Sequence, residues 1–135
     1  MGRSTMTHVL EVGIEHLDRE NPNGSPCVQG WNIINGQLKQ SSDGSTFESR
    51  NPAILDDCVG IFPLSNETDV HEALAAARDA FPSWAATPAP TRGQIIGNMG
   101  RLLMEHKDAV VAIETREIGK TLKESAGSVQ EAIDT

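Results

Sequence analysis

The sequence predicts an α/β chain in which short strands come first, about four helices follow, and the domain is incomplete. Three observations carry this prediction. Residues 31–64 are rich in turn signals and short apolar runs, and from residue 66 onward apolar residues recur at helical spacing. The last helical pattern is still running at Thr135, with neither a glycine stop nor a basic last turn, so this helix is expected to be cut. With 135 residues, 38% hydrophobic and 22% charged, one modest globular domain is the upper limit.

Charge, cysteine and histidine patterns argue against several function classes. Acidic residues outnumber basic residues 19 to 11, and the net charge of −8 argues against a nucleic-acid partner, which needs a basic face. No apolar run reaches the roughly 20 residues of a membrane span, and a signal-like block is missing, so we expect a cytoplasmic protein with no membrane partner. Cys27 and Cys58 are far apart and the histidines are scattered, which predicts reduced structural thiols and no metal site of that type.

Turns and strands are expected in the first half of the chain. Residues 9–19 have loosely helical apolar spacing that a glycine interrupts, which predicts at most a short helix. Residues 31–34 then meet Asn35 and Gly36, the dipeptide best suited to a type I′ turn, because both of its central residues need a positive φ. A β-hairpin with residues 37–40 is therefore predicted.

Two further extended segments follow the hairpin. Residues 46–49 come after a second turn signal, and the apolar run 58–64 is able to pair with them. Pro63 has no backbone donor, so the second of these strands is expected either to be an edge strand or to end there.

The first predicted helix begins after Ser65. Asn66 is expected to cap it together with Asp69, three residues on. Its apolar face comprises Val70, Ala73, Leu74, Ala77 and Phe81. Pro82 follows this face, and Thr87 is expected to cap a second helix whose first turn holds two prolines.

The second helix contains three glycines among its apolar residues. Gly93, Gly97 and Gly100 each lower helix propensity by up to about 1 kcal/mol relative to alanine. They also permit close approach of another backbone. We therefore expect this helix to depend on packing.

The stretch REIGKT, residues 116–121, resembles the end of a phosphate-binding loop but is better explained as a junction between two helices. The first glycine of such a loop would stand at Glu114, and the residues before it have helical rather than strand character. Gly119 is expected to end a third helix that follows His106, with Lys120 complementing its negative end. Thr121 and Glu124 form a capping box for a fourth.

Several spaced motifs, taken in order, resemble the amino-terminal part of the NAD(P)-dependent aldehyde dehydrogenase superfamily. They comprise Ile34-Asn35-Gly36, Asn51-Pro52-Ala53, the V-G-x-F-P strand, the D-V-x-x-A-L-A-A-A-R-x-A-F-x-x-W helix, T-P-A-P-x-R and E-x-G-K-x-x-x-E-S. The resemblance covers residues 31–135, and residues 1–30 form an unmatched extension. The general character of the matched sequence resembles the semialdehyde-oxidising branch of the family. Residues 53–58 depart from the family pattern, which leaves the local hairpin register open.

The resemblance implies that the complete enzyme oxidises an aldehyde or semialdehyde to the carboxylic acid. In the family a cysteine thiolate attacks the aldehyde, hydride passes to NAD or NADP, and a glutamate activates water. Those residues lie beyond the matched region, and neither Cys27 nor Cys58 aligns with the nucleophile. No dinucleotide-binding glycine turn is present either. No catalytic or cofactor-binding residue is therefore assigned, and the segment alone is expected to bind no cofactor.

Two further sites follow from the resemblance. Family members hold an alkali cation at positions that here are Ser49, Arg50 and Glu117, and oxygen ligands suit such an ion. An ion pair between Arg50 and Glu117 is an equally simple account of these residues. The last helix borders the substrate entrance in the family, which makes candidates of Gln130, Glu131 and Asp134 on that helix. The alternative reading of these residues is a solvated helix face.

Domain organisation and function are predicted accordingly. Residues 31–64 should supply the hairpin and strands, residues 66–135 the helices, and the Rossmann core and catalytic domain are absent. The leading hypothesis is an inactive front segment of an aldehyde dehydrogenase, whose partners are the remainder of the enzyme chain, an aldehyde substrate and further copies in a homo-oligomer. The alternative is a non-catalytic helical binding or assembly module.

Overall fold

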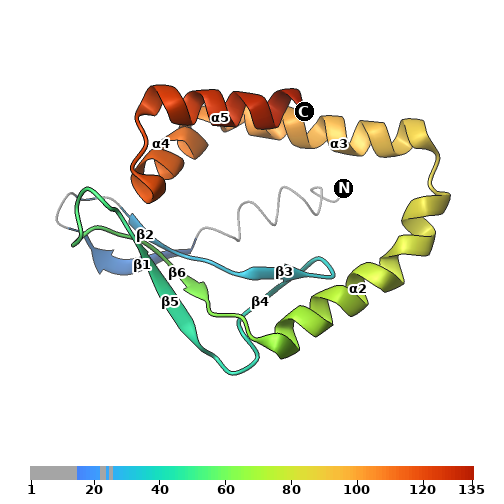
Figure 1. Cartoon of the computed structure of the whole chain (residues 1–135), viewed down its shortest axis with the longest axis horizontal. Coiled ribbons are helices and arrows are strands. Elements are labelled where there is room, and N and C mark those ends of the chain that lie inside the picture. The colour runs from blue at the N-terminus through green and yellow to red at the C-terminus, as the bar shows by residue number, and fades with distance from the viewer. Residues whose placement is uncertain (1–14, 22–23, 25) are drawn as a thin grey trace. The chain divides into compact units, whose positions relative to one another are not determined.

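The computed structural model describes residues 15–21, 24 and 26–135, and the chain divides into two compact units. One unit contains residues 1–50 and 54–79, and the other contains residues 51–53 and 80–135. The strands belong to the first unit, and α3, α4 and α5 to the second (Figure 1). Helix α2 (Glu67–Ala86) runs from the first unit into the second.

The first unit is built on a four-stranded sheet with the order β1-β2-β6-β5. Its strands are β1 (Glu15–Glu20), β2 (Pro26–Gln29), β5 (Thr46–Arg50) and β6 (Cys58–Pro63). Strand β2 pairs with β1 antiparallel and with β6 parallel, and β5 pairs with β6 antiparallel. The predicted pairing of the two extended segments is thus confirmed, and β6 is a central strand that ends at Pro63.

The short helix predicted for residues 9–19 is wrong where the structure describes it. Residues 15–20 form β1, and residues 9–14 lie outside the described residues. Apolar spacing over so short a segment does not decide between helix and strand, and pairing with β2 decides it here. Strand β2 itself was not predicted, because turn residues precede it and it is only four residues long.

The Asn-Gly hairpin is confirmed. Strands β3 (Asn32–Ile34) and β4 (Gln37–Lys39) pair antiparallel, with Ile34 opposite Gln37. Asn35 has a φ of 52° and Gly36 a φ of 72°, so both turn residues have the positive φ that a two-residue primed turn requires.

Phe62 packs against glycine backbone in the sheet. A Cβ atom added to Gly30 would lie 2.1 Å from Phe62 Cδ1, and one added to Gly60 would lie 2.7 Å from Phe62 Cε2. On the neighbouring strand Phe47 contacts the same side chain, with ring centroids 5.7 Å apart. The two glycines therefore make room for the aromatic ring.

A network of polar side chains joins the start of α2 to the turn before β5. Asn66 Oδ1 accepts a hydrogen bond from the Thr68 backbone N–H at 2.9 Å, and Asp69 Oδ2 accepts one from the Asn66 backbone N–H at 2.9 Å, so the predicted cap is confirmed. Asp69 Oδ1 also accepts from the Ser42 backbone N–H at 2.8 Å. Asp43 accepts from the Ser45 backbone N–H, and this bond is the main reason why the pKa of Asp43 falls from 3.8 to about 2.

Helix α2 extends further than predicted, and the predicted role of Thr87 is wrong. Pro82 lies inside α2, which continues to Ala86. A proline disturbs the helix at and before its own position, and beyond it the Thr87 N–H donates to the Ser83 carbonyl at 3.1 Å. The Thr87 hydroxyl donates to the same carbonyl at 2.9 Å, so Thr87 completes the end of α2. The N-cap of α3 is Pro88, without a side-chain hydrogen bond.

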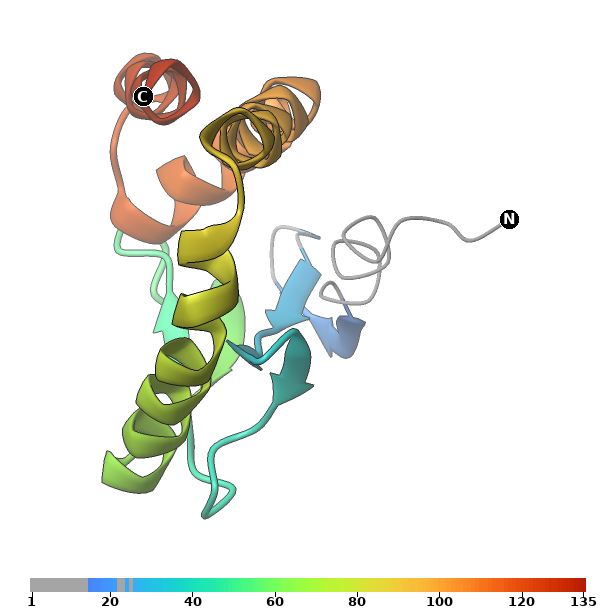
Figure 2. The ribbon, with the colours of Figure 1, turned by 90° about the vertical axis from the view of Figure 1, so that its right-hand side faces the viewer.

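The second unit consists mainly of α3 (Ala89–Glu105), α4 (Lys107–Ile118) and α5 (Leu122–Asp134). Helices α3 and α5 lie side by side, and Figure 2 views them nearly end-on. A Cβ at Gly100 would lie 3.2 Å from the Ile133 carbonyl oxygen, so close backbone approach is confirmed there. Gly93 and Gly97 have no atom within 4 Å of an added Cβ.

Candidate functional site

Two of the motifs that carry the family resemblance meet in the second unit. Gly119, from the E-x-G-K motif, has a φ of +78° and ends α4 in the left-handed conformation. A Cβ at this position would lie 2.8 Å from Pro52 Cγ, in the N-P-A motif. Asn51 shapes that motif, because its Oδ1 accepts a hydrogen bond from the Ala53 backbone N–H at 2.9 Å. The glycine is therefore needed both for its φ and for the space that Pro52 occupies.

The capping box predicted after this glycine is confirmed. Thr121 Oγ1 accepts a hydrogen bond from the Glu124 backbone N–H at 3.3 Å, and Glu124 Oε2 accepts one from the Thr121 backbone N–H at 3.1 Å. The Thr121 hydroxyl donates to the same carboxylate at 2.9 Å. That side-chain bond is the first cause of the lowered pKa of Glu124, and the backbone bond is the second.

Lys120 connects α4 to α5. Its ammonium group donates to Glu114 Oε1 at 3.0 Å and to Ser128 Oγ at 3.0 Å. A second side-chain hydrogen bond joins the same two helices, since the Thr115 hydroxyl on α4 donates to the hydroxyl of the buried Ser125 on α5 at 3.0 Å. The interpretation of REIGKT as a structural junction agrees with these bonds, since the lysine already has two oxygen partners.

The residues predicted for a substrate entrance lie along the last two turns of α5. Gln130 Nε2 donates to Asp134 Oδ1 at 2.9 Å, and Lys107 Nζ donates to Gln130 Oε1 at 2.6 Å. Glu131 is exposed, and its backbone carbonyl accepts from the Thr135 hydroxyl. The structure thus brings Gln130 and Asp134 together and leaves the Glu131 side chain in solvent.

Asp134 also lines a groove of about 430 Å³ between α3 and α5. The groove is mainly apolar, with Arg101 and Asp134 as its charged residues. Its walls are formed by Ile96, Gly97, Met99, Gly100, Arg101 and Leu103 on α3 and by residues 132–135 at the other side. A surface of this kind is able to hold an apolar group but contains no cysteine, histidine or serine able to act as a nucleophile.

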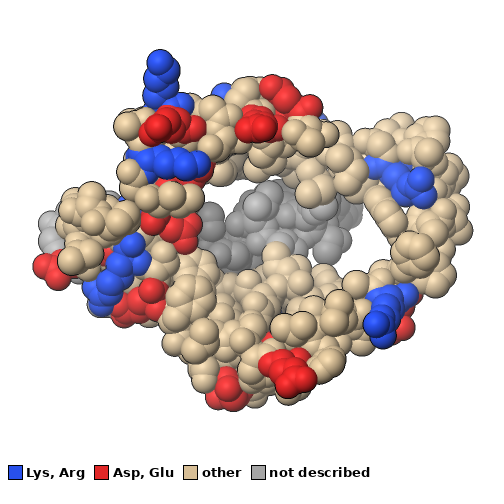
Figure 3. All heavy atoms as spheres, viewed as in Figure 1, with Lys and Arg blue, Asp and Glu red and all other residues tan. Residues whose placement is uncertain are grey.

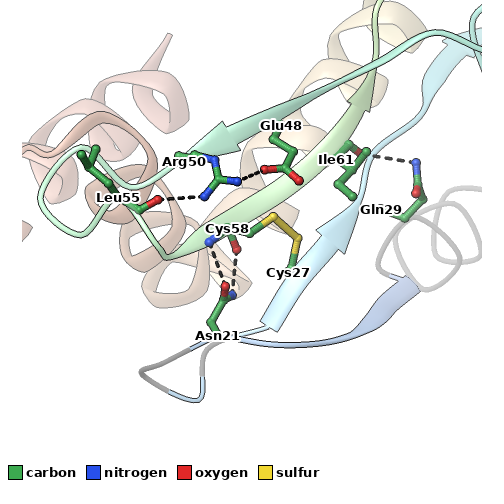
Figure 4. Close-up of a disulfide and its surroundings, with 8 residues drawn as sticks. All are labelled: Asn21, Cys27, Gln29, Glu48, Arg50, Leu55, Cys58 and Ile61. Atoms are coloured by element: carbon green, nitrogen blue, oxygen red, sulfur yellow. Dashed lines mark hydrogen bonds and ion pairs between the residues drawn. A yellow bond between two sulfur atoms is a disulfide. The ribbon is translucent and has the colours of Figure 1, made fainter.

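The residues predicted for an alkali cation belong to different units. Ser49 and Arg50 lie on β5 in the first unit, and Glu117 lies on α4 in the second. The Arg50 guanidinium donates to the Leu55 carbonyl at 2.9 Å and pairs with Glu48 (Figure 4). Among residues 15–21, 24 and 26–135, no group of three His, Cys, Asp or Glu side chains is arranged to hold a metal ion.

The expectation of reduced cysteines is wrong for this structure. Cys27 on β2 and Cys58 on β6 form a disulfide, with their Cα atoms 5.3 Å apart (Figure 4). The two residues are separated by 31 positions in the chain. Sequence distance alone did not reveal their proximity, because it depends on the parallel pairing of two strands of which one was not predicted.

The distribution of surface charge and the hydropathy of the helices in the described part of the chain are in line with the acidic composition and its 38% of hydrophobic residues. On the face that Figure 3 shows, basic and acidic side chains are interspersed and the basic ones do not gather into a patch. Within the described residues, none of the helices has the length and apolarity that a membrane crossing requires.

Comparison with known proteins agrees with the motifs. A family model described as "Aldehyde dehydrogenase family" matches residues 39–135. The chain is 43% identical over 103 residues to an alpha-ketoglutarate semialdehyde dehydrogenase of Haloferax volcanii, covering 76% of this chain and 21% of that protein. It is 36% identical to malonate-semialdehyde dehydrogenase 2 of Geobacillus kaustophilus, with the same coverage.

Solved structures show the same likeness. An NAD-dependent aldehyde dehydrogenase from Sinorhizobium meliloti shares the fold with a TM-score of 0.79 at 23% identity, over 91% of this chain and 25% of that one. An E. coli NADP-dependent enzyme aligns with a TM-score of 0.74 at 33% identity, over 76% of this chain and 21% of that one. The chain spans about a fifth of the length of the curated relatives it matches. On the matched motifs, the family model and these relatives, the chain belongs to the aldehyde dehydrogenase family.

Proposed function

We propose that this chain acts as the amino-terminal part of an NAD(P)-dependent enzyme that oxidises an aldehyde, of the semialdehyde class, to its carboxylic acid. The observation that carries the proposal is the match to the semialdehyde dehydrogenases over about a fifth of their length. Because the names of both relatives specify a semialdehyde, this class is the substrate we infer. The chain by itself is then inactive.

The described residues of this chain lack the glycine-containing turn that would hold the pyrophosphate of a dinucleotide. In the described part of the chain, the passage from a strand to a helix is the one from β6 to α2, through Leu64, Ser65 and Asn66. It contains no glycine, so its backbone does not offer the close approach that a pyrophosphate needs. The cofactor site therefore belongs to the remainder of the enzyme, and no step of the reaction is assigned to residues of this chain.

The exposed apolar faces of α2, α3 and α4 support a role in assembly with that remainder. Large apolar side chains on these helices are between 37% and 66% exposed. They are Val70, Leu74, Phe81 and Trp84 on α2, Ile95, Ile96, Met99 and Met104 on α3, and Ile113 and Ile118 on α4. Apolar surface on this scale marks an interaction site or an aggregation liability. We assign it to contact with the cofactor-binding part of the complete enzyme.

A chimera tests the proposal. The 103 matching residues of this chain replace their counterparts in the Haloferax volcanii relative. We expect NAD(P)-dependent semialdehyde oxidation by the chimera and none by the 135-residue chain alone. Phe81→Asp should abolish the activity of the chimera, because Phe81, 66% exposed in this chain, would be covered by the rest of the enzyme and the change would bury an unpaired charge there. Ala75→Asp puts the same charge on another face of α2 and should be tolerated. Robust aldehyde oxidation by the chain alone would refute the proposal.

A non-catalytic assembly module is the second candidate, and the same exposed faces favour it. A monodisperse monomer that unfolds cooperatively, together with an inactive chimera, would support the module. Aggregation of the isolated chain together with an active chimera would support the enzyme segment.

The cation and entrance residues keep their place in the proposal. We infer that the backbone carbonyls of Ser49 and Arg50 and the carboxylate of Glu117 hold an alkali cation in the complete enzyme, and the engagement of the Arg50 side chain with Glu48 is consistent with this. Thermal stabilisation of the chimera by Na⁺ or K⁺ should then disappear in Glu117→Gln. An unchanged response to both ions would count against the site.

We also infer that Gln130, Glu131 and Asp134 border the substrate entrance. Asp134 lines the apolar groove and accepts a hydrogen bond from Gln130, which supports this inference. Asp134→Ala in the chimera should alter KM among semialdehydes of different length while kcat changes little.

We further propose that the complete enzyme is a cytoplasmic homo-oligomer. Cell fractionation would test the location, and light scattering of the native enzyme and of the chimera's parent protein would test the assembly.

A further inference from the structure

The Cys27–Cys58 disulfide lies at the junction between two strand pairs. Strands β1 and β2 (residues 15–20 and 26–29) form an antiparallel ribbon, and β6 pairs with β5 on its other side. Both cysteines have no exposed surface. Figure 4 shows the bond crossing directly from β2 to β6. It therefore links the ribbon covalently to the rest of the sheet.

The described noncovalent contacts between the ribbon and β6 are local, and they include a hydrogen bond from Gln29 Nε2 to the Ile61 carbonyl at 3.3 Å (Figure 4). The parallel ladder pairs Val28 with Gly60 and Gln29 with Ile61. Beyond its end, the Gly30 N–H donates to the Ile61 carbonyl at 2.8 Å. A ladder this short gives limited resistance to opening, since each net hydrogen bond stabilises little once water competes.

Asn21 adds a clamp at the other end of the contact. Its Nδ2 donates to the Cys58 carbonyl at 2.9 Å, and its Oδ1 accepts from the Cys58 N–H at 2.8 Å. Asn21 is itself buried. The side chain satisfies the backbone of Cys58 only while the ribbon is in place, so opening of the ribbon breaks both of these hydrogen bonds.

We propose that the Cys27–Cys58 disulfide is a redox-sensitive anchor that holds the β1–β2 ribbon on β6, so that reduction releases the ribbon. The inference does not depend on the enzymatic function. The reductant is an external dithiol. One of its thiolates attacks a cysteine Sγ and forms a mixed disulfide, and its second thiol then displaces the protein sulfur. The Sγ–Sγ bond is broken, the two cysteines gain two electrons and two protons, and the dithiol becomes a disulfide.

Burial makes this reaction depend on motion of the ribbon. An external thiolate reaches neither sulfur while both residues are covered, so the ribbon must open before the bond is attacked. Once the bond is reduced, the constraint on the intervening chain is lost and opening becomes more frequent. The edge of β6 that now pairs with β2 is then free to pair with another strand.

The first measurement is the number of thiols. The chain is incubated with glutathione disulfide and then denatured without reductant in the presence of iodoacetamide, which alkylates free thiols. Its mass is then measured by mass spectrometry. We expect no alkylated cysteine, and two after treatment with dithiothreitol. Two alkylated cysteines in the oxidised sample would overturn the proposal.

The second measurement is amide hydrogen exchange of the oxidised and the reduced chain. We expect peptides from residues 15–29 and from β6 to exchange at least about tenfold faster after reduction, and peptides from α4 and α5 to be unchanged. The variant Cys27→Ser with Cys58→Ser should match the reduced chain and should not respond to dithiothreitol. Equal exchange in both redox states, or acceleration that extends equally to α4 and α5, would contradict a local anchor.

Discussion

Replacing Gly119 with alanine tests the junction of the two family motifs directly. The φ of +78° costs a residue with a side chain about 1–2 kcal/mol. The new Cβ would also lie 2.8 Å from Pro52 Cγ, and crowding of this kind costs about 1–3 kcal/mol. Together the free energy of unfolding of the second unit should fall by about 2–5 kcal/mol.

The assay must report on the second unit alone, because two compact units need not unfold together. Trp84 lies in this unit and Trp31 in the other, so urea unfolding is followed by Trp84 fluorescence in a Trp31→Phe background. This background is mild, since the buried Trp31 Nε1 has no hydrogen-bond partner among the described residues.

Gly127 provides the matched control. It lies within α5, and an added Cβ there meets no atom within 4 Å. Gly127→Ala should therefore stabilise the same unit by up to about 1 kcal/mol, through helix propensity. Pro52→Ala combined with Gly119→Ala should recover the part of the loss that comes from crowding and leave the part that comes from φ. The reasoning is refuted if Gly119→Ala lies within about 0.5 kcal/mol of the parent or matches Gly127→Ala.

Four further outcomes are expected in the same isolated chain. Thr121→Ala should lower the free energy of unfolding by about 1 kcal/mol in urea titrations, because the α5 cap is lost. Gly30→Ala should lower it by about 1–3 kcal/mol, because its Cβ would lie 2.1 Å from the Phe62 ring; an unchanged midpoint would contradict this contact. The pKa of Asp43 is depressed from 3.8 to about 2, so the stability that its carboxylate adds to the folded state is complete above pH 4 and lost as the pH falls toward 2. The melting temperatures of the parent and of Asp43→Asn should therefore differ above pH 4 and converge below it. Gly93→Ala should raise the midpoint, and a decrease would reveal a contact that the structure lacks.

Local signals in the sequence were sufficient wherever one short segment determines its own conformation. Asn35-Gly36 specified a turn because few other dipeptides accept two positive φ values, and the structure has both. Thr121 and Glu124 specified a helix start because each satisfies a backbone donor of the other. In both cases the physical cause lies within four residues, so no knowledge of the tertiary structure was needed.

Features that depend on distant partners were not predictable in this way. Residues 9–19 have loosely helical apolar spacing, but residues 15–20 form strand β1 because β2 is available for pairing. The disulfide requires that β2 and β6 be parallel neighbours, which no spacing of two cysteines encodes. Thr87 is a good N-cap residue in isolation, but its backbone N–H and its hydroxyl both donate to the Ser83 carbonyl, which places it at the end of α2 instead. The candidate site follows the same division, since the Gly119 conformation was expected from its position and the Pro52 contact was not.

The glycines of α3 connect this division to the proposed function. Gly100 is explained within the chain, because α5 passes close to it. Gly93 and Gly97 weaken the helix, and an added Cβ at either one would meet no atom within 4 Å, while Ile96 and Met99 on the same helix are about half exposed. A helix that is intrinsically weak and apolar on an uncovered face is stabilised when a second surface covers it, because burial of that face compensates for the low propensity. The same glycines that lower the stability of the isolated chain would let a neighbouring backbone approach closely in a longer enzyme. Under the proposed function, the low helix propensity of α3 and the space for a neighbouring backbone would be two consequences of the same missing Cβ atoms.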